Sequence, residues 1–222
     1  MNAKLNGKAR NTQRALVYRT LARLFRPPQA EGLEHLRDRE LPALVKALQA
    51  LGAEAALLKG ARALRRALSA LDEERLAAEW EANFEASGGL TCPLGEVTHT
   101  TESSPEAWLH GYRLADVAGF YKAFGVEVTP GSERPDHLAV ELEFMHLLAV
   151  KEAVAEEQGE AEGAAVCREA TVSFLSDHLG RWTGKVRARL EEGSGKLYPL
   201  AAAVLDGFVA FDAGRQPGFP RP

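Results

Sequence analysis

The sequence predicts an all-α protein, folded as a single helical bundle of about eight to ten helices. Apolar residues recur at helical spacing along most of the 222 residues, and strict alternation of apolar and polar residues is not sustained anywhere. Proline and glycine punctuate these periodic stretches, where they are expected to end helices. We expect a helical domain over residues 1–213 and a proline-rich tail over residues 214–222.

Four helices are predicted in the amino-terminal part of the chain. They cover about Asn11 to Phe25, Leu41 to Leu51, Ala53 to Ala70, and Asp72 through Trp80 to Phe84. Pro27 and Pro28 stop the first helix, because the residue before a proline avoids helical geometry. Asp72 is the expected N-cap of the fourth helix, because its carboxylate can accept hydrogen bonds from the free N–H groups.

Five more helices are predicted in the remainder. They cover about Ser104 to Phe124, Pro135 to Glu157, Ala164 to Leu179, Trp182 to Glu191, and Leu197 to Phe211. Ser104 and Pro105 have the character of an N-cap and a first helical residue, and Gly125 ends that helix. Pro135 is expected to open the next helix, with Asp136 in its first turn.

The longest predicted loop runs from Ser87 to Ser103, with the sequence SGGLTCPLGEVTHTTES. Its Gly, Ser, Thr and Pro content is typical of neither helix nor strand. Loops of this length within a compact domain frequently carry function. This segment is therefore the first candidate for a functional site.

Composition excludes several classes of protein. A net charge of −4 disfavours sequence-independent nucleic-acid binding, which needs a basic surface. The amino terminus lacks a signal-peptide core and no apolar run is long enough to span a bilayer, so we expect a cytoplasmic protein. Cys92 and Cys167 are too few and too far apart for a disulfide framework or a cysteine-based zinc site, and two free thiols are expected.

Two patterns raise the possibility of catalysis. Glu143 and His146 have the Glu-x-x-His spacing of helical di-iron proteins, but no second such motif occurs in the chain. Glu141 and Glu143 lie about 200° apart around a helix, so they cannot both join one metal site. Cys92 and His99 resemble a thiol and base pair, although no third, orienting group can be named. The glycines match neither phosphate-binding pattern.

Aromatic and acidic residues together favour a binding surface. Most aromatic residues are expected in the core, and those beside the long loop, Trp80, Phe84 and Trp108, are candidate contacts. The stretch from Glu127 to Glu162 holds ten acidic residues against Arg134 and Lys151. The simpler interpretation is a solvated helix face, but an acidic rim beside an apolar groove also suits a peptide that is basic and then hydrophobic.

Several segments resemble one family. PDHLAVELEFMHLLA, from Pro135 to Ala149, closely resembles the signature helix of the TorD/DmsD/NarJ chaperones. The segments that resemble other family motifs are Tyr18 to Phe25, FYKAFG at Phe120 to Gly125, HLGRW at His178 to Trp182 and LYPLA at Leu197 to Ala201. Together they cover nearly the whole chain, and the Pro-Asp-His helix is the most specific of them.

The resemblance implies a TorD-like, all-helical chaperone without catalysis, metal or cofactor. Its implied ligand is the twin-arginine signal peptide, or the apo form, of a molybdoenzyme of the dimethyl sulfoxide reductase family, which it would assist in cofactor insertion and proofreading before export. The resemblance places Asp136 and His137 on the binding surface, near the loop from Cys92 to Gly95. Together with the aromatic candidates, the predicted binding residues are Pro135, Asp136, His137, Glu141, Trp80, Phe84, Pro93, Leu94, Gly95 and Trp108. Members of the dimethyl sulfoxide reductase chaperone branch tend to have an aromatic residue in this loop, where this chain has Leu94. The segment ANFEASGGLTCPLGE is more similar to chaperones of dimethyl sulfide dehydrogenase-type enzymes.

Three hypotheses remain open at the level of sequence. The first is the signal-peptide chaperone, as a monomer or homodimer. The second is a helical metalloenzyme that uses Glu143 and His146. The third is an adaptor whose acidic helix binds a folded basic protein. The sequence does not identify a client enzyme, and no phosphate motif supports binding of guanine nucleotide.

Overall fold

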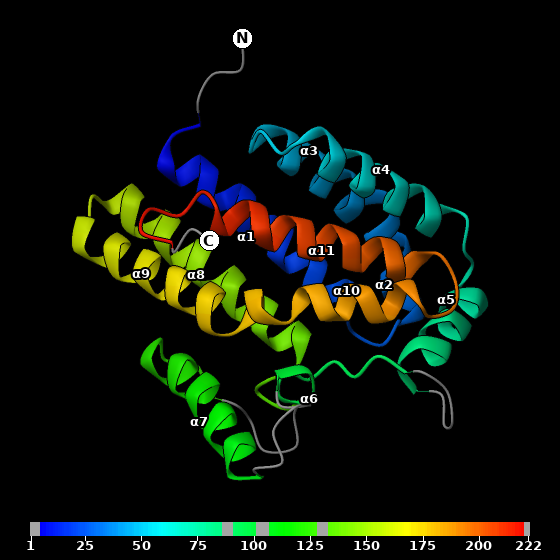
Figure 1. The fold of residues 1–222 in the computed structure, drawn as a ribbon. Coiled ribbons are helices and arrows are strands. Elements are labelled where there is room, and N and C mark those ends of the chain that lie inside the picture. Colours follow the sequence, from blue (N-terminus) through cyan, green and yellow to red (C-terminus); the bar gives the residue numbers. More distant parts are fainter. Residues whose placement is uncertain (1–4, 86–90, 101–106, 128–132, 220–222) are drawn as a thin grey trace.

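The fold was analysed in a computed structural model, which describes residues 5–85, 91–100, 107–127 and 133–219, without the side chains of 30–31 and 107–108 (Figure 1). Every regular element within these ranges is helical, as predicted. The α-helices are α1 Gly7–Leu24, α2 Ala30–His35, α3 Leu41–Ala50, α4 Ala55–Ser69, α5 Glu73–Trp80, α6 Glu96–Thr100, α7 Ala107–Ala123, α8 Leu138–Gln158, α9 Ala161–Asp177, α10 Thr183–Glu191 and α11 Leu197–Ala213. Shorter turns are η1 Leu36–Glu40, η2 Glu81–Glu85 and η3 Leu179–Arg181.

Helix α1 lies at the centre of the bundle. It packs along α8 and α3, and α11 crosses beside it to contact α4 and α10 (Figure 1). Val17 and Leu21 of α1 and Phe208 of α11 are fully buried in the shared core. Each fully buried aliphatic side chain contributes roughly 1.5–3 kcal/mol, so this central helix accounts for much of the stability. None of the described helices combines the length and the apolar character needed to cross a bilayer.

Local signals explain most helix ends. The Asp72 carboxylate accepts from the backbone N–H of Arg75 at 2.9 Å, which confirms the predicted cap of α5. Gly125 adopts a φ of +75°, a conformation that favours glycine, directly after α7. Helix α1 begins at Gly7 rather than at Asn11, because the Asn6 side chain accepts from Ala9 N–H at 2.8 Å. The predicted cap at Ser104 lies outside the described residues.

The segment from 29 to 40, for which the sequence predicts no regular element, forms α2 and the π-helical turn η1. Leu33 and Leu36 are buried three residues apart, a helical spacing hidden among charged neighbours. The buried carboxylate of Glu40 accepts from Arg23 at 2.7 Å. After α11, the Gln216 side chain donates to Asp212 at 3.0 Å and Phe219 packs partly against the core. The domain boundary at residue 213 stays a prediction.

A buried ion network ties four helices together. The guanidinium of Arg14 in α1 donates to Asp212 of α11 at 2.8 and 3.0 Å, and to Glu152 of α8 at 2.9 Å. Tyr18 also donates to Asp212, at 2.7 Å, and Arg168 of α9 donates to Glu152 at 3.1 Å. Burial, followed by the charge of Asp212, raises the pKa of the Tyr18 hydroxyl. The charged groups of this network can lie in the interior because each of them is paired with an opposite charge.

Replacing Arg14 by Met should destabilise the protein by about 3–5 kcal/mol, because Asp212 and Glu152 would remain buried without their cation. Chemical denaturation followed by circular dichroism measures this change. The matched control is Arg19→Met, on the exposed face of the same helix, where a change within about 0.5 kcal/mol is expected. Equal effects of the two substitutions would show that the network adds no stability.

Candidate functional site

The candidate site forms where residues 91–100 meet the start of α8. Backbone hydrogen bonds join Leu138 N–H to the Leu94 carbonyl at 2.8 Å, and Glu96 N–H to the Asp136 carbonyl at 2.9 Å. Gly95 and His137 form an isolated antiparallel bridge. The expectation that Ser87 to Ser103 is irregular throughout is wrong, because Glu96–Thr100 forms α6 and holds buried side chains.

Asp136 is a buried structural residue of this junction. Its carboxylate accepts from Arg134 at 2.9 and 3.0 Å and from the backbone N–H of Val97 at 3.1 Å. A Cβ at Gly95 would lie only 3.2 Å from this carboxylate, so glycine permits the close approach of the two segments. The prediction that Asp136 lies in the first turn of the helix is wrong, since α8 begins at Leu138.

His137 is the N-cap of α8. Its Nδ1 atom accepts from Ala139 N–H at 3.2 Å, which requires an unprotonated Nδ1. Burial, the largest cause, lowers the pKa of His137, and Arg26 lowers it further, while Glu133 opposes the shift. Burial and Arg26 both favour a neutral imidazole ring, in which Nδ1 accepts and Nε2 can donate.

An open pocket of about 380 Å³ lies at this junction. Seven of the ten residues predicted for the binding surface line it: Trp80, Phe84, Pro93, Leu94, Gly95, Asp136 and His137. The rings of Trp80 and Phe84 lie 4.4 Å apart, and the Trp80 indole N–H donates to Glu85 at 2.8 Å. The pocket therefore has an aromatic wall from α5 and η2, opposite the start of α8.

The pocket continues along the Pro27–Pro28 connection. Pro27 also lines a second pocket of about 150 Å³, walled by Leu24, Leu33, Leu76 and Tyr198. Beyond it, a third pocket shares Pro28, Leu33 and Leu76 with the second and is bordered by Glu73 and Glu74. We call these three pockets the α5 groove. Shared lining residues thus connect the three pockets from His137 past Pro27 to α5, and Arg23 and Arg26 also line the second of them.

The three other predicted residues do not line this pocket. The carbonyl of Pro135 accepts from the Tyr121 hydroxyl at 2.7 Å, so Pro135 supports the site from outside the pocket. The prediction of Glu141 as a surface contact is wrong, because its side chain is fully buried. The side chain of Trp108 lies outside the described residues.

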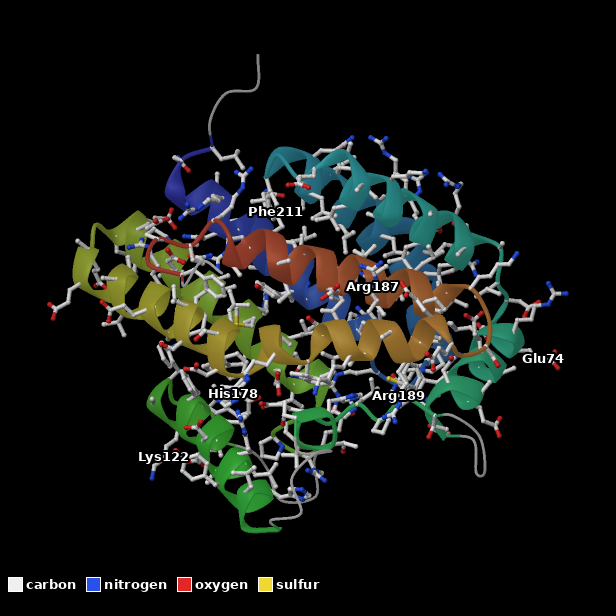
Figure 2. The ribbon with its side chains drawn as sticks, in the orientation of Figure 1. Glu74, Lys122, His178, Arg187, Arg189 and Phe211 are labelled. Carbon is white, nitrogen blue, oxygen red and sulfur yellow. The ribbon has the colours of Figure 1, made fainter. Side chains whose placement is uncertain are left out.

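Glu141 belongs to a buried polar cluster that the sequence analysis missed. The Trp182 indole donates to Glu141 at 3.1 Å. The His178 ring binds Glu96 at 3.0 Å and lies 3.5 Å from Asp116 of α7, and Figure 2 labels His178. Burial, followed by the charge of Glu96, raises the pKa of Glu141, which favours a protonated Glu141 in the folded protein.

A sequence signal for this burial exists. Glu141 and Glu152 fall on the same helical stripe as Met145 and Leu148, at spacings of four, three and four residues, and all four side chains are buried. The partners of the two glutamates come from distant segments, so the sequence alone does not reveal what satisfies them.

The acidic stretch from Glu127 to Glu162 is largely paired rather than free. Asp136 and Glu152 are buried with arginines, and Glu143, Glu156 and Glu157 contact Arg26, Arg168 and Lys8. Three exposed carboxylates on α5 and η2, Glu73, Glu74 and Glu85, have no ion pair with a described residue, and Figure 2 shows Glu74 pointing away from the body. The negative rim of the α5 groove therefore comes mainly from these residues.

The residues considered for catalysis have other contacts. Burial raises the pKa of the Cys92 thiol to about 12, which disfavours the reactive thiolate. The His99 ring bonds to the Pro93 carbonyl at 2.7 Å and stacks on Trp182. Glu143 binds Arg26 at 3.0 Å, whereas His146 bonds to the Ala15 carbonyl at 2.9 Å. Among the described residues, no group of three or more His, Cys, Asp or Glu side chains is arranged to hold a metal ion.

Comparison with solved structures identifies the class of fold. The chain is similar to a structure from Archaeoglobus fulgidus described as a redox enzyme maturation protein, with a TM-score of 0.50. The match covers 90% of this chain and 94% of that chain at 19% sequence identity, a likeness that concerns the fold alone.

The family follows from the sequence match of residues 34–188, more than half of the chain, to the nitrate reductase delta subunit family. The chain belongs to this family. The predicted kinship with NarJ-type proteins is thereby confirmed.

Curated relatives include two assembly chaperones that are each 36% identical over 124 residues. They are the selenate reductase assembly chaperone protein of Thauera selenatis and the chlorate reductase assembly chaperone protein of Ideonella dechloratans. Each match covers 55% of this chain and 61% of the relative. The perchlorate reductase assembly chaperone protein of Dechloromonas aromatica is 38% identical over 78 residues, which cover 35% of this chain and 34% of that protein.

Replacing Glu141 by Gln should flatten the dependence of stability on pH. The pKa of Glu141 is raised in the folded state, so its contribution is present below the unfolded pKa and is lost as pH rises through the folded value. We expect the free energy of unfolding of the unmodified protein to fall as pH rises from about 4.5, the ordinary glutamate value, toward neutrality, with a slope of at most about 1.4 kcal/mol per pH unit from this proton. The amide keeps an acceptor for Trp182 and removes the charge.

Urea denaturation across this pH range measures the effect. Glu143→Gln is the matched control, because Glu143 lies on the exposed side of the same helix, and it should leave the pH profile unchanged. A Glu141→Gln profile as steep as that of the unmodified protein would rule out a raised pKa of Glu141 as the source of the slope.

Proposed function

We propose that this protein is a cytoplasmic maturation chaperone, without catalytic activity, that binds the twin-arginine signal peptide or the apo form of a molybdoenzyme of the dimethyl sulfoxide reductase family. It would assist cofactor insertion and proofreading before export. The observation that carries the proposal is the α5 groove, where residues of the resemblance motif and an aromatic wall line one pocket. The names of the curated relatives, which are assembly chaperones of oxyanion reductases, support it.

The groove suits a peptide with two arginines followed by an apolar stretch. Glu85 at the first pocket and Glu73 and Glu74 at the third offer exposed carboxylates for the guanidinium groups. Leucine and tyrosine side chains between them offer apolar surface for the following residues. Charge would mainly accelerate and orient the encounter, while the apolar contacts would supply most of the affinity.

Asp136 is expected to hold the shape of this site rather than to contact the ligand. Its carboxylate is neutralised by Arg134 and satisfied by Val97 N–H, so an arginine of the ligand would have to compete with both. Removing it would open the junction between α6 and α8 and disturb the pocket as a whole. Side chains of the pocket wall are therefore better probes of binding than Asp136.

Phe84→Ala should weaken binding of a twin-arginine peptide by about tenfold, because Phe84 is a half-buried aromatic of the pocket wall. Isothermal titration calorimetry with a synthetic peptide measures the affinity, which should also fall with added salt. Tyr112→Ala is the matched control, since Tyr112 is an aromatic residue of α7 that is 63% exposed. Circular dichroism would verify that both variants are folded.

A second peptide, in which glutamine replaces the paired arginines, separates the charged contribution to binding from the apolar one. It should bind more weakly than the twin-arginine peptide. This loss of affinity should be smaller for a Glu85→Gln variant than for the unmodified protein. Absence of binding to twin-arginine peptides under all these conditions would refute the signal-peptide assignment.

A further inference from the structure

The outer face of α4 carries a stripe of positive charge. Lys59, Arg62 and Arg66 are spaced by three and four residues, so they follow one another along the helix, and Arg65 flanks them. All four side chains are exposed. On the opposite side, Ala61, Leu64 and Leu68 are fully buried. The stripe is therefore presented on a helix that is firmly packed against the bundle.

These four cations have no partner within the described part of the chain, and α4 itself contains no acidic residue. Some exposed or half-buried cations elsewhere are paired, as Arg187 is with Glu191 at 2.8 Å and Arg168 with Glu152 at 3.0 Å, whereas α4 places four unpaired cations side by side on one helix. Like charges at spacings of three and four destabilise a helix. The helix dipole favours Arg66 in the last turn, but it gives no reason for Lys59 and Arg62.

The surroundings of the stripe favour a protein partner. The remaining outward residues in line with it are Ala55 and Ser69, so no bulky apolar side chain could anchor the helix in a bilayer. On the side toward α11, Glu54 and Arg187 line one pocket with Gly60, and Arg187 pairs with Asp206 (Figure 2). The carboxylates of Glu54 and Asp206 border the positive stripe on this side, so its width suits a single acidic helix better than a broad polyanion such as duplex DNA.

We propose that the outer face of α4 is a docking surface for a folded protein that presents carboxylates at helical spacing. Lys59 and Arg66 are seven residues apart, about 10 Å along the helix axis, which matches two turns of an acidic helix on the partner. Such a contact pairs each cation with one carboxylate and removes the like-charge repulsion within α4. The surface is separate from the α5 groove and does not depend on the function proposed for that groove.

The probe for this surface is a 15-residue helical peptide with glutamates at matching positions, labelled for fluorescence anisotropy. Lys59→Glu/Arg62→Glu should weaken its binding by about tenfold or more, and Lys59→Gln/Arg62→Gln by a smaller factor. The matched control is Lys122→Glu/Arg181→Glu, which alters the net charge equally at exposed cations of α7 and η3. Figure 2 shows Lys122 on the side of the molecule away from α4.

Specific docking predicts loss in the α4 variants, little change in the control, and weaker binding of a scrambled peptide of the same composition. Equal losses in both charge-reversal variants, or no binding by the unmodified protein, would overturn the proposal. So would tighter binding to phosphatidylserine vesicles or to a 15-base-pair DNA duplex. Affinity for a twin-arginine peptide should be unchanged by the α4 substitutions, so this test and that of the groove fail independently.

Discussion

Four helices meet, directly or through one shared carboxylate, at the guanidinium group of Arg14. This residue joins α1 to α11 through Asp212 and to α8 through Glu152, and Arg168 extends the network to α9. A buried charge tolerates only those arrangements in which its partners are in place. The network therefore determines how the central helices lie relative to one another. The far end of α1 leads into Pro27, which lines two pockets of the α5 groove.

Charge in this protein is used in two separate ways. Buried carboxylates act inside the protein: Asp136 accepts from Val97 N–H at the start of α8, and Glu96 of α6 binds the His178 ring. Among the described residues, unpaired exposed charges include the carboxylates at the edge of the α5 groove and the four cations of α4. A count of acidic residues along the chain thus overstates the charge available to a ligand, because partners far away in sequence neutralise much of it.

Hydrophobic periodicity and capping residues were sufficient to predict the longer helices, because both act within a few neighbouring residues. The resemblance of the Pro-Asp-His segment correctly placed Asp136 and His137 beside Leu94 and Gly95. The sequence did not predict that Glu141 is buried with Trp182, or that residues 96–100 form a helix. Both features depend on contacts across forty or more residues, and no local pattern encodes those partners. The short segment 29–40 was missed because charged residues mask its two buried leucines.

The closure of the bundle by α11 also orders events during synthesis. The contact between Arg14 and Asp212 spans 198 positions, so it forms only after the last helix has left the ribosome. Until then α11 does not cover the apolar side of α1, and Arg14 lacks its hydrogen bonds to Asp212. Non-local contacts of this kind slow folding and prolong the exposure of apolar surface. The nascent chain is thus itself vulnerable to aggregation until α11 has emerged and packed.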